Sequence, residues 1–181
     1  FLESLPFRLT LGQQSAIDDI EHDLMNTRAM NRLVQGDVGC GKTVVAETAI
    51  FHAVSAGWQA AFMAPTEILA RQHFAKLSVD FAKFGMRIAL LISGLKSAER
   101  REILSGISSG DIDIIVGTHA LIQSDVEFAK LGLVITDEQH RFGVNQRKIL
   151  SEKSEAVNVL VMSATPIPRT LAATVFGDMD F

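Results

Sequence analysis

Six short runs of mostly apolar residues, separated by segments with helical spacing, constrain the fold of this chain more than any other feature. They cover residues 33–35, 60–64, 88–92, 112–116, 131–136 and 157–162. Because the runs are continuous rather than alternating, they predict strands that are covered on both faces. Helices between such strands join parallel neighbours through right-handed crossovers. The pattern therefore predicts an α/β fold with three layers, α/β/α, built on a mostly parallel sheet.

The segments between these runs have the periodicity of amphipathic helices. Ile17, Ile20 and Leu24 recur at intervals of three or four residues, which places them on one helical face. Further helices are expected over residues 43–55, 67–84 and 97–108. We expect Ser97 to cap the last of them, because a serine hydroxyl can accept a hydrogen bond from a free amide of the first turn.

The composition is that of a folded domain. The chain has 181 residues, of which 48% are hydrophobic and 21% are charged, so disordered and collagen-like classes are excluded. No apolar run approaches the roughly 18 residues that a membrane helix needs, so no membrane partner is expected. The net charge of -4 excludes a surface that is basic throughout but leaves room for a local basic groove.

The cysteine content and the two ends of the chain bear on its compartment and its completeness. Cys40 is the only cysteine in the sequence, so an internal disulfide is excluded and a reducing, cytoplasmic location is expected. The chain opens at Phe1 without an initiator methionine and closes on Phe181 without a helix stop. We interpret residues 1–181 as a single domain cut from a larger protein, with a processed mature chain as the alternative.

A glycine-rich segment between the first apolar run and the next helix predicts a phosphate site. It fits the pattern G-x-x-x-x-G-K-[ST] and consists of Gly36, Asp37, Val38, Gly39, Cys40, Gly41, Lys42 and Thr43. The glycines allow backbone amides to surround phosphate oxygens, and the helix N-terminus adds its positive dipole end. We expect Lys42 to reach the β- and γ-phosphates of a nucleotide and Thr43 to bind Mg²⁺.

Two acids follow the fifth apolar run, where a strand is expected to end. Ligands bind at the carboxyl ends of parallel strands, so Asp137 and Glu138 are expected beside the phosphate loop. A phosphate-loop hydrolase needs one carboxylate for Mg²⁺ and another for the attacking water. Asp137 suits the metal and Glu138 suits the base, because successive strand residues point to opposite sides. Ser163 and Thr165 follow the next run and are expected close to this pair.

Together these segments resemble the motifs of the first RecA-like lobe of superfamily 2 helicases. The phosphate loop resembles motif I, DEQH at 137–140 resembles motif II, and SAT at 163–165 resembles motif III. PTEILA at 65–70 resembles motif Ia, GTHA at 117–120 resembles motif Ib, and Leu9, Thr10 and Gln13 resemble the Q motif. The resemblance covers nearly the whole chain and implies a RecA-like P-loop NTPase lobe.

Within that superfamily the sequence is most similar to the RecG family of branched-DNA helicases, which act at stalled replication forks. The similar segments are LPF at 5–7, GTHALIQ at 117–123, DEQHRFGV at 137–144 and SATPIPR at 163–169. The transcription-repair coupling translocases are near relatives and remain an alternative, although Gln139 favours RecG, since those relatives usually carry glutamate there. Cys40 departs from the usual serine or alanine, which leaves phosphate binding by backbone groups intact.

The resemblance implies ATP and Mg²⁺ as cofactors and a role for each residue of the nucleotide motifs. Gln13 would read the adenine edge. Lys42 and Thr43 would hold phosphates and Mg²⁺. Asp137 would hold Mg²⁺, and Glu138 would activate the attacking water.

The resemblance also implies DNA as a partner. His140, Ser163 and Thr165 would couple the nucleotide to DNA, and the candidate DNA contacts are Thr66, Thr118, His119 and Arg169. The longer parent would act on branched DNA, in recombination and repair, as a monomer. A second RecA-like lobe of the same parent would supply an arginine finger, without which the isolated lobe is expected to be nearly inactive.

Two other classes of protein remain open at this point. A small P-loop kinase or nucleotide switch that acts alone would also use the phosphate loop, but it leaves Thr118 and Ser163 without a role. A nucleotide-gated interaction module without turnover is a second alternative, against which the position of Glu138 argues.

Overall fold

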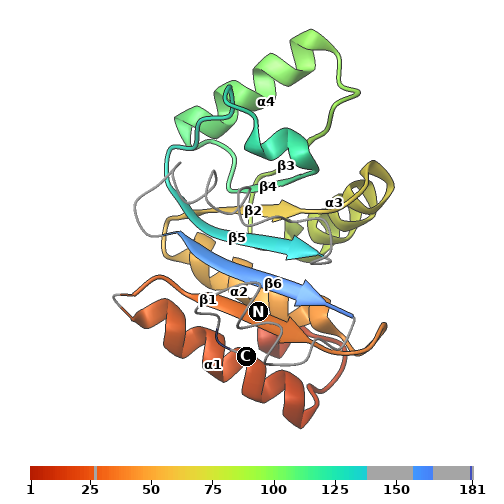
Figure 1. Cartoon of the computed structure of the whole chain (residues 1–181), viewed down its shortest axis with the longest axis vertical. Helices are drawn as coiled ribbons and strands as arrows, with labels where there is room; N and C mark the ends of the chain where they lie inside the picture. Colours follow the sequence, from red (N-terminus) through yellow and green to blue (C-terminus); the bar gives the residue numbers. More distant parts are fainter. Residues whose placement is uncertain (27, 138–156, 165–179, 181) are drawn as a thin grey trace.

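The six predicted strands form one sheet in the computed structural model, which describes residues 1–26, 28–137, 157–164 and 180. The strands are β1 (Asn31–Gln35), β2 (Gln59–Met63), β3 (Ile88–Leu91), β4 (Ile114–Gly117), β5 (Leu131–Asp137) and β6 (Asn158–Ser163). Their order is β1-β6-β5-β2-β4-β3, and every pairing between them is parallel (Figure 1). The predicted α/β fold with a mostly parallel sheet is confirmed, and these six strands are parallel throughout.

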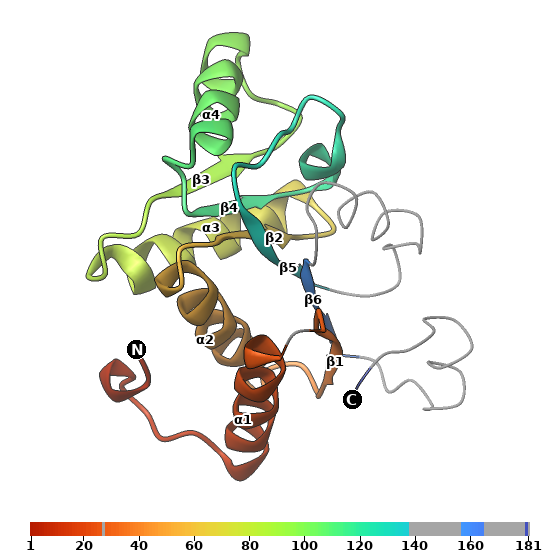
Figure 2. The same ribbon diagram turned by 90° about the vertical axis from the view of Figure 1, so that its left-hand side faces the viewer.

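The helices of the described residues alternate with the strands along the chain. They are α1 (Leu11–Met25), α2 (Lys42–Ser55), α3 (Glu67–Ala82) and α4 (Ser97–Ser109), with short 3-10 turns η1 (Leu2–Ser4) and η2 (His119–Ile122). Figure 2 shows α1, α2 and α3 together on one side of the sheet. Within the described part of the chain, no helix is long and apolar enough to cross a membrane.

Alternate residues of the strands point to opposite faces of the sheet, as the pleat requires, and most of the buried ones belong to two large apolar cores. Phe62 and Ile135 belong to the core on the face that α1, α2 and α3 cover. Met63 and Val134 belong to the core on the opposite face, which they share with Ile107 of α4. Helices therefore cover both faces of the sheet, which confirms the predicted three layers.

Two threonines fix the starts of α1 and α3. Thr10 forms a capping box, since its hydroxyl accepts from the Gln13 amide and its own amide donates to Gln13 Oε1. The Thr66 hydroxyl caps α3 by accepting from the amide three residues further on, at 3.3 Å. The prediction that Ser97 caps α4 is wrong. Lys96 is the N-cap, and Ser97 is already helical, so its hydroxyl does not lie over the free amides.

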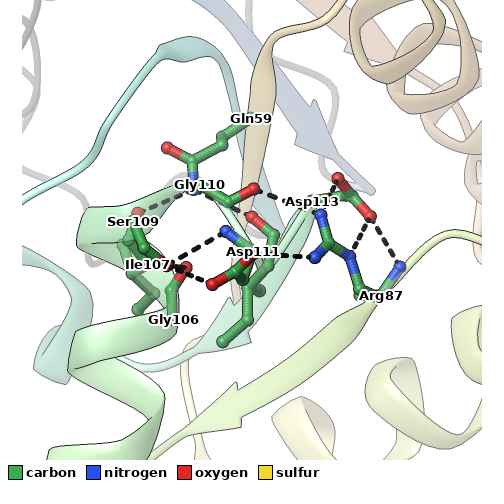
Figure 3. Close-up of polar contacts among 9 residues, drawn as sticks. Gln59, Arg87, Gly106, Ile107, Ser109, Gly110, Asp111 and Asp113 are labelled. Atoms are coloured by element: carbon green, nitrogen blue, oxygen red, sulfur yellow. Dashed lines mark hydrogen bonds and ion pairs between the residues drawn. The ribbon is translucent and has the colours of Figure 1, made fainter.

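A buried glutamine joins three segments at the amino edge of the sheet, where β2 and β4 begin. The Gln59 Nε2 donates to the carbonyl oxygens of Ile107 at 2.9 Å and Ile112 at 2.8 Å. Its Oε1 accepts from the Lys130 amide at 2.9 Å. One side chain therefore ties β2 to the end of α4 (Figure 3), to the loop before β4 and to the segment before β5.

An exposed ion-pair group lies beside this glutamine. Arg87 pairs with Asp113 at 3.3 Å and with Asp111 at 3.2 Å, and it donates to the Gly110 carbonyl (Figure 3). The Ser109 hydroxyl donates to Asp111 at 2.7 Å. That hydrogen bond, followed by the one from Arg87, lowers the pKa of Asp111. We call Gln59, Arg87, Asp111 and Asp113 the amino-edge cluster.

Candidate functional site

The ends of three adjacent strands meet at the carboxyl edge of the sheet. β6 lies between β1 and β5, and in its register Ser163 pairs with Gln35 while Met162 pairs with Asp137. The Gly36 amide donates to the carbonyl oxygen of Ser163 at 3.1 Å. Since neighbouring strands lie about 4.8 Å apart, the start of the phosphate loop, Ser163 and Asp137 lie side by side along this edge.

The phosphate loop connects β1 to α2 through two glycines in the left-handed backbone region. Gly39 has a φ of 81° and Gly41 a φ of 85°, values that other residues adopt at a cost. Gly41 is the N-cap of α2, so the first amides of a 14-residue helix face the loop. Such a helix start is a favourable site for an anion. Thr43 is the second residue of this helix.

Lys42 lies folded across the loop. Its Nζ donates to the carbonyl oxygens of Gly36 at 2.6 Å and Asp37 at 2.8 Å. Both partners are neutral carbonyl groups, whereas a phosphate oxygen is a charged and stronger acceptor. The ammonium group can therefore exchange these partners for a phosphate without a change in the fold.

Cys40 and Val38 complete the outer side of the loop. Both are exposed, and the Cys40 thiol is the free cysteine of the chain. A Cβ atom added to Gly36 would lie 2.6 Å from Cys40 Sγ, so the thiol fills the space that glycine leaves. The side chain at position 40 thus takes part in packing the loop, while backbone groups remain available for phosphate.

Gln13 supports the loop from α1. Its Nε2 donates to the carbonyl oxygen of Cys40 at 2.9 Å, and its Oε1 accepts from the Thr10 amide at 2.9 Å. An amide side chain carries a second N–H and a second lone pair, so each end keeps one further hydrogen-bonding position. A Cβ atom on Gly41 would lie 2.2 Å from this Nε2, which shows how closely Gln13 approaches the loop.

Asp137 is the last residue of β5, and a histidine from α3 holds its carboxylate. His73 Nε2 and Asp137 Oδ2 are 2.8 Å apart, and the two side chains are 15% and 21% exposed. The His73 ring packs against Phe62 of β2, with 4.4 Å between the ring centres. Sequence reasoning missed His73, although its spacing from Ala70 and Leu77 places it on the buried face of α3.

The donor set at this edge suits Mg²⁺. Thr43 offers a hydroxyl oxygen and Asp137 a carboxylate oxygen, and the described residues contain no cluster of three histidine, cysteine or acidic side chains in metal-binding arrangement. Mg²⁺ prefers oxygen ligands, keeps several waters and commonly takes one or two protein ligands together with phosphate oxygens. Two protein oxygens beside a phosphate loop are therefore a fitting set.

A groove of about 390 Å³ opens beside the loop, between α2, α3 and the N-terminal segment. Lys76 of α3 lines it and pairs with Glu47 of α2 and with Asp80. Burial raises the pKa of the Glu47 carboxyl despite this pairing. Burial acts to lower the pKa of Lys76, but its hydrogen bonds to Asp80 and Glu47 outweigh burial, and the pKa is raised. The groove wall thus carries a charged contact between α3 and the phosphate-loop helix.

The candidate DNA residues that the structure describes follow β2 and β4, on the other half of the same edge. Thr66 is exposed and follows β2, while Thr118 and His119 follow β4. The amide of Ala64 donates to the Gly117 carbonyl at 2.9 Å, which holds these two strand ends together. His119 is exposed, whereas Thr118 is only 7% exposed and offers mainly its backbone to a partner.

Four of the sequence-predicted site residues lie outside the described residues. They are Glu138, His140, Thr165 and Arg169. Their proposed roles stay predictions of the sequence.

Comparison with known proteins identifies the family. A model of the family described as DEAD/DEAH box helicase matches residues 10–174. The chain belongs to this family. As a DEAD/DEAH box helicase domain it has the RecA-like fold that its strand order and phosphate loop indicate.

The most similar relatives that we compared are proteins named ATP-dependent DNA helicase RecG. The Streptococcus pneumoniae protein is 59% identical over 177 residues, which are 98% of this chain and 26% of that protein. The Thermotoga maritima protein is 54% identical over 99% of this chain and 23% of its own length. This helicase domain thus spans about a quarter of the length of the curated relatives that it matches.

Two solved structures have a similar fold. A structure of RecG bound to a three-way DNA junction superposes with a TM-score of 0.87 at 51% identity, over 98% of this chain and 24% of that one. Mss116p bound to single-stranded RNA and AMP-PNP has a TM-score of 0.72 at 21% identity, over 97% of this chain and 39% of that one. At that identity the second likeness shows the fold alone.

Proposed function

We propose that this chain is the ATP-binding motor lobe of a RecG-type DNA helicase. The observation that carries the proposal is the meeting of the phosphate loop, Ser163 and Asp137 at the ends of three adjacent parallel strands. Identity of 54–59% with RecG relatives over 98–99% of the chain supports RecG over a transcription-repair coupling translocase or a stand-alone kinase.

Each site residue has one task in this proposal. The loop amides and Lys42 hold the nucleotide phosphates, Thr43 and Asp137 hold Mg²⁺, and Gln13 reads the adenine edge with its remaining hydrogen-bonding positions. Glu138 orients and deprotonates the attacking water. Mg²⁺, when bound, neutralises charge on the phosphate oxygens.

The same proposal assigns the partners. The longer protein acts as a cytoplasmic monomer on branched DNA, in recombination and repair at stalled forks. Hydroxyl and backbone groups after β2 and β4, at Thr66, Thr118 and His119, contact DNA phosphates together with Arg169. His140, Ser163 and Thr165 transmit the nucleotide state to DNA. A second RecA-like lobe closes the cleft and adds an arginine finger. The chain matches 26% of the Streptococcus pneumoniae relative, whose remaining length is sufficient for such a lobe.

Replacing the proposed base tests the reaction. Glu138→Gln in the full-length enzyme keeps the size and hydrogen bonding of the side chain but removes the base. We expect ATP binding to be retained and DNA-stimulated turnover to fall by roughly 10²–10⁴-fold, the usual contribution of a positioned general base. Binding is measured with a fluorescent nucleotide analogue and turnover by phosphate release on a forked DNA.

The control for that experiment is Glu102→Gln, an exposed acid on α4 far along the sheet from the loop. It is expected to behave as the unsubstituted enzyme. Lost ATP binding with unchanged turnover of the bound ATP in Glu138→Gln would make residue 138 a metal ligand or a structural acid. An unsubstituted enzyme without any ATPase activity on DNA would remove the helicase proposal itself.

A further inference from the structure

α3 reaches both halves of the carboxyl edge. Its N-cap, Thr66, lies at the end of β2, among the candidate DNA contacts. Seven residues later His73 touches Asp137, the proposed metal ligand at the end of β5. At 1.5 Å per residue, the two points are about 10 Å apart along one continuous helix. A single rigid element therefore connects a candidate DNA group with a candidate Mg²⁺ group.

We propose that His73 is a positioning residue that fixes the Asp137 carboxylate and ties it to the helix that begins at the DNA edge. The inference rests on the proposed function, because it needs Asp137 to face Mg²⁺ and Thr66 to face DNA. It adds a residue that lies in none of the motifs from which the nucleotide roles were drawn.

The hydrogen bond has a defined direction. A carboxylate that binds Mg²⁺ can only accept, so the proposal requires His73 Nε2 to donate to Asp137 Oδ2, which lies 2.8 Å away. The contact uses Oδ2, and the Oδ1 lone pairs remain for a metal ion or a metal-bound water. Partners that hydrogen-bond a ligating carboxylate orient it, and their loss typically costs about 10–100-fold in metal affinity or activity.

The imidazole is itself held in place from two sides. Its ring packs on Phe62, which is fully buried in the middle layer, at 4.4 Å between ring centres. Its helix is anchored one turn further on, where Lys76 pairs with Glu47 of the phosphate-loop helix. Glu47 lies four residues after Thr43, so α3 contacts both elements that carry the proposed Mg²⁺ ligands. A displacement of α3 at Thr66 would thus reach Asp137 through His73.

Two substitutions separate the hydrogen bond from the ring packing. His73→Phe keeps a ring against Phe62 but removes the N–H group, whereas His73→Gln keeps a donor at similar reach but removes the ring. Gln72→Ala, at an exposed neighbouring position of α3, is the matched control for substitution on this helix. Should His73→Phe fail to fold, His73→Asn replaces it. The asparagine amide lies one bond closer to the backbone than His73 Nε2 and therefore does not reach Asp137 Oδ2.

The first measurement uses the 181-residue chain and fluorescent mant-ADP, with affinity determined in EDTA and during a titration with MgCl₂. For His73→Phe we expect unchanged affinity in EDTA, since His73 does not touch the loop, and an apparent Mg²⁺ affinity weaker by about 10-fold. His73→Gln is expected to restore most of it. The positioning role would be overturned if His73→Phe had the same apparent Mg²⁺ affinity as the unsubstituted chain. It would also be overturned if His73→Phe and His73→Gln lost equal amounts of that affinity.

The second measurement uses the full-length enzyme, with ATP turnover compared with and without forked DNA. We expect His73→Phe to lower the maximal DNA stimulation by several-fold while the DNA concentration for half-stimulation stays the same. Unchanged stimulation beside a weakened Mg²⁺ response would overturn the link to the DNA edge. If the unsubstituted chain binds no mant-ADP at all, the proposed function fails, and that result is distinct from a failure of His73 alone.

Discussion

At the amino edge of the sheet, where Figure 3 places Gln59, its side-chain amide bonds main-chain groups of three different segments, whereas at the carboxyl edge Lys42 bonds two carbonyl oxygens of its own loop. The amino-edge bonds hold together parts of the chain that are distant in sequence. The bonds of Lys42 hold one side chain against its own loop, and the bond between His73 and Asp137 holds one side chain against another.

This difference separates stability from binding. The main-chain partners of Gln59 lie in α4, in the loop before β4 and in the segment before β5, and they cannot leave its side chain unless these parts separate from β2. Loop carbonyls can give up the Lys42 ammonium to a phosphate, because a phosphate oxygen is a charged and stronger acceptor. We therefore expect substitutions at the amino edge to change the free energy of unfolding, and substitutions at the carboxyl edge to change ligand affinity.

Gln59→Leu is expected to have the largest effect. It leaves two carbonyl groups and one amide without their side-chain partner in a buried place. At about 1 kcal/mol for each lost hydrogen bond, the free energy of unfolding should fall by roughly 3 kcal/mol. The measurement is urea denaturation followed by circular dichroism, and the exposed Gln72→Leu on α3 is the control for the same chemical change.

The comparison between the two edges is decided by the nucleotide affinity of the same variant. Folded Gln59→Leu should bind mant-ADP as the unsubstituted chain does. A large loss of affinity together with unchanged stability would show that the amino-edge cluster belongs to the binding machinery and would end the proposed division.

Lys42→Ala is expected to have the next largest effect. Removing the ammonium takes away a charged partner of the phosphates, a contribution of about 1.5–3 kcal/mol, so nucleotide affinity should weaken by roughly 10- to 100-fold. The urea midpoint should stay close to that of the unsubstituted chain, because the two lost bonds lie within one exposed loop. Titration calorimetry with ADP and Mg²⁺ measures the affinity, and Lys96→Ala, at the exposed N-cap of α4, is the control.

Unchanged calorimetric affinity in Lys42→Ala would contradict the phosphate assignment of the loop. Unfolding of the variant would instead show that the loop bonds of Lys42 stabilise the fold as strongly as those of Gln59.

Asp111→Asn is expected to have the smallest effect, a slight loss of stability near neutral pH that disappears in acid. Hydrogen bonds from Ser109 and Arg87 lower the pKa of Asp111 in the folded chain below its ordinary value of 3.8. A depressed carboxyl pKa contributes stability above the unfolded value, and that contribution is lost as the pH falls through the folded value. The melting temperature of the unsubstituted chain should therefore drop more steeply below pH 3.8 than that of the variant. If the melting temperatures of the two proteins fall equally as the pH is lowered below 3.8, this exposed group adds nothing to stability.

The strands could be predicted from the sequence because burial on both faces leaves continuous apolar runs. Each observed strand begins and ends within two residues of its run, as with β5 (Leu131–Asp137) and the run at 131–136. The order of the strands could not be predicted in this way, since it depends on which helices pack on which face. The start of α4 at Ser97 was predicted correctly, whereas its cap was not, because Lys96 precedes the helix as N-cap without a side-chain hydrogen bond.

For the candidate site, the sequence supplied the residues of the loop and the strand ends, whereas contacts between elements came from the structure. The pattern at 36–43 has a fixed spacing, so it can be recognised from the sequence alone. His73 lies 64 residues from Asp137, and Lys76 lies 29 residues from Glu47. A polar residue on the buried face of a helix is a signal that a partner exists, but the identity of that partner depends on the packing of α3 against β5 and α2.

The position of β6 also determines when the site can exist. β6 is last of the six strands to leave the ribosome, yet it fills the place between β1 and β5. Among the described strands, β1 pairs only with β6, so before β6 docks the strand that precedes the phosphate loop has no neighbour in the sheet. The edge of β5 that ends at Asp137 is likewise unpaired on the side that β6 will occupy. At about 5–20 residues per second, synthesis from Gln35 to Ser163 takes roughly 6–26 seconds. Asp137 is made 163 − 137 = 26 residues before Ser163, so both halves of the nucleotide site exist only at the end of that interval, and insertion of β6 then joins them in one sheet.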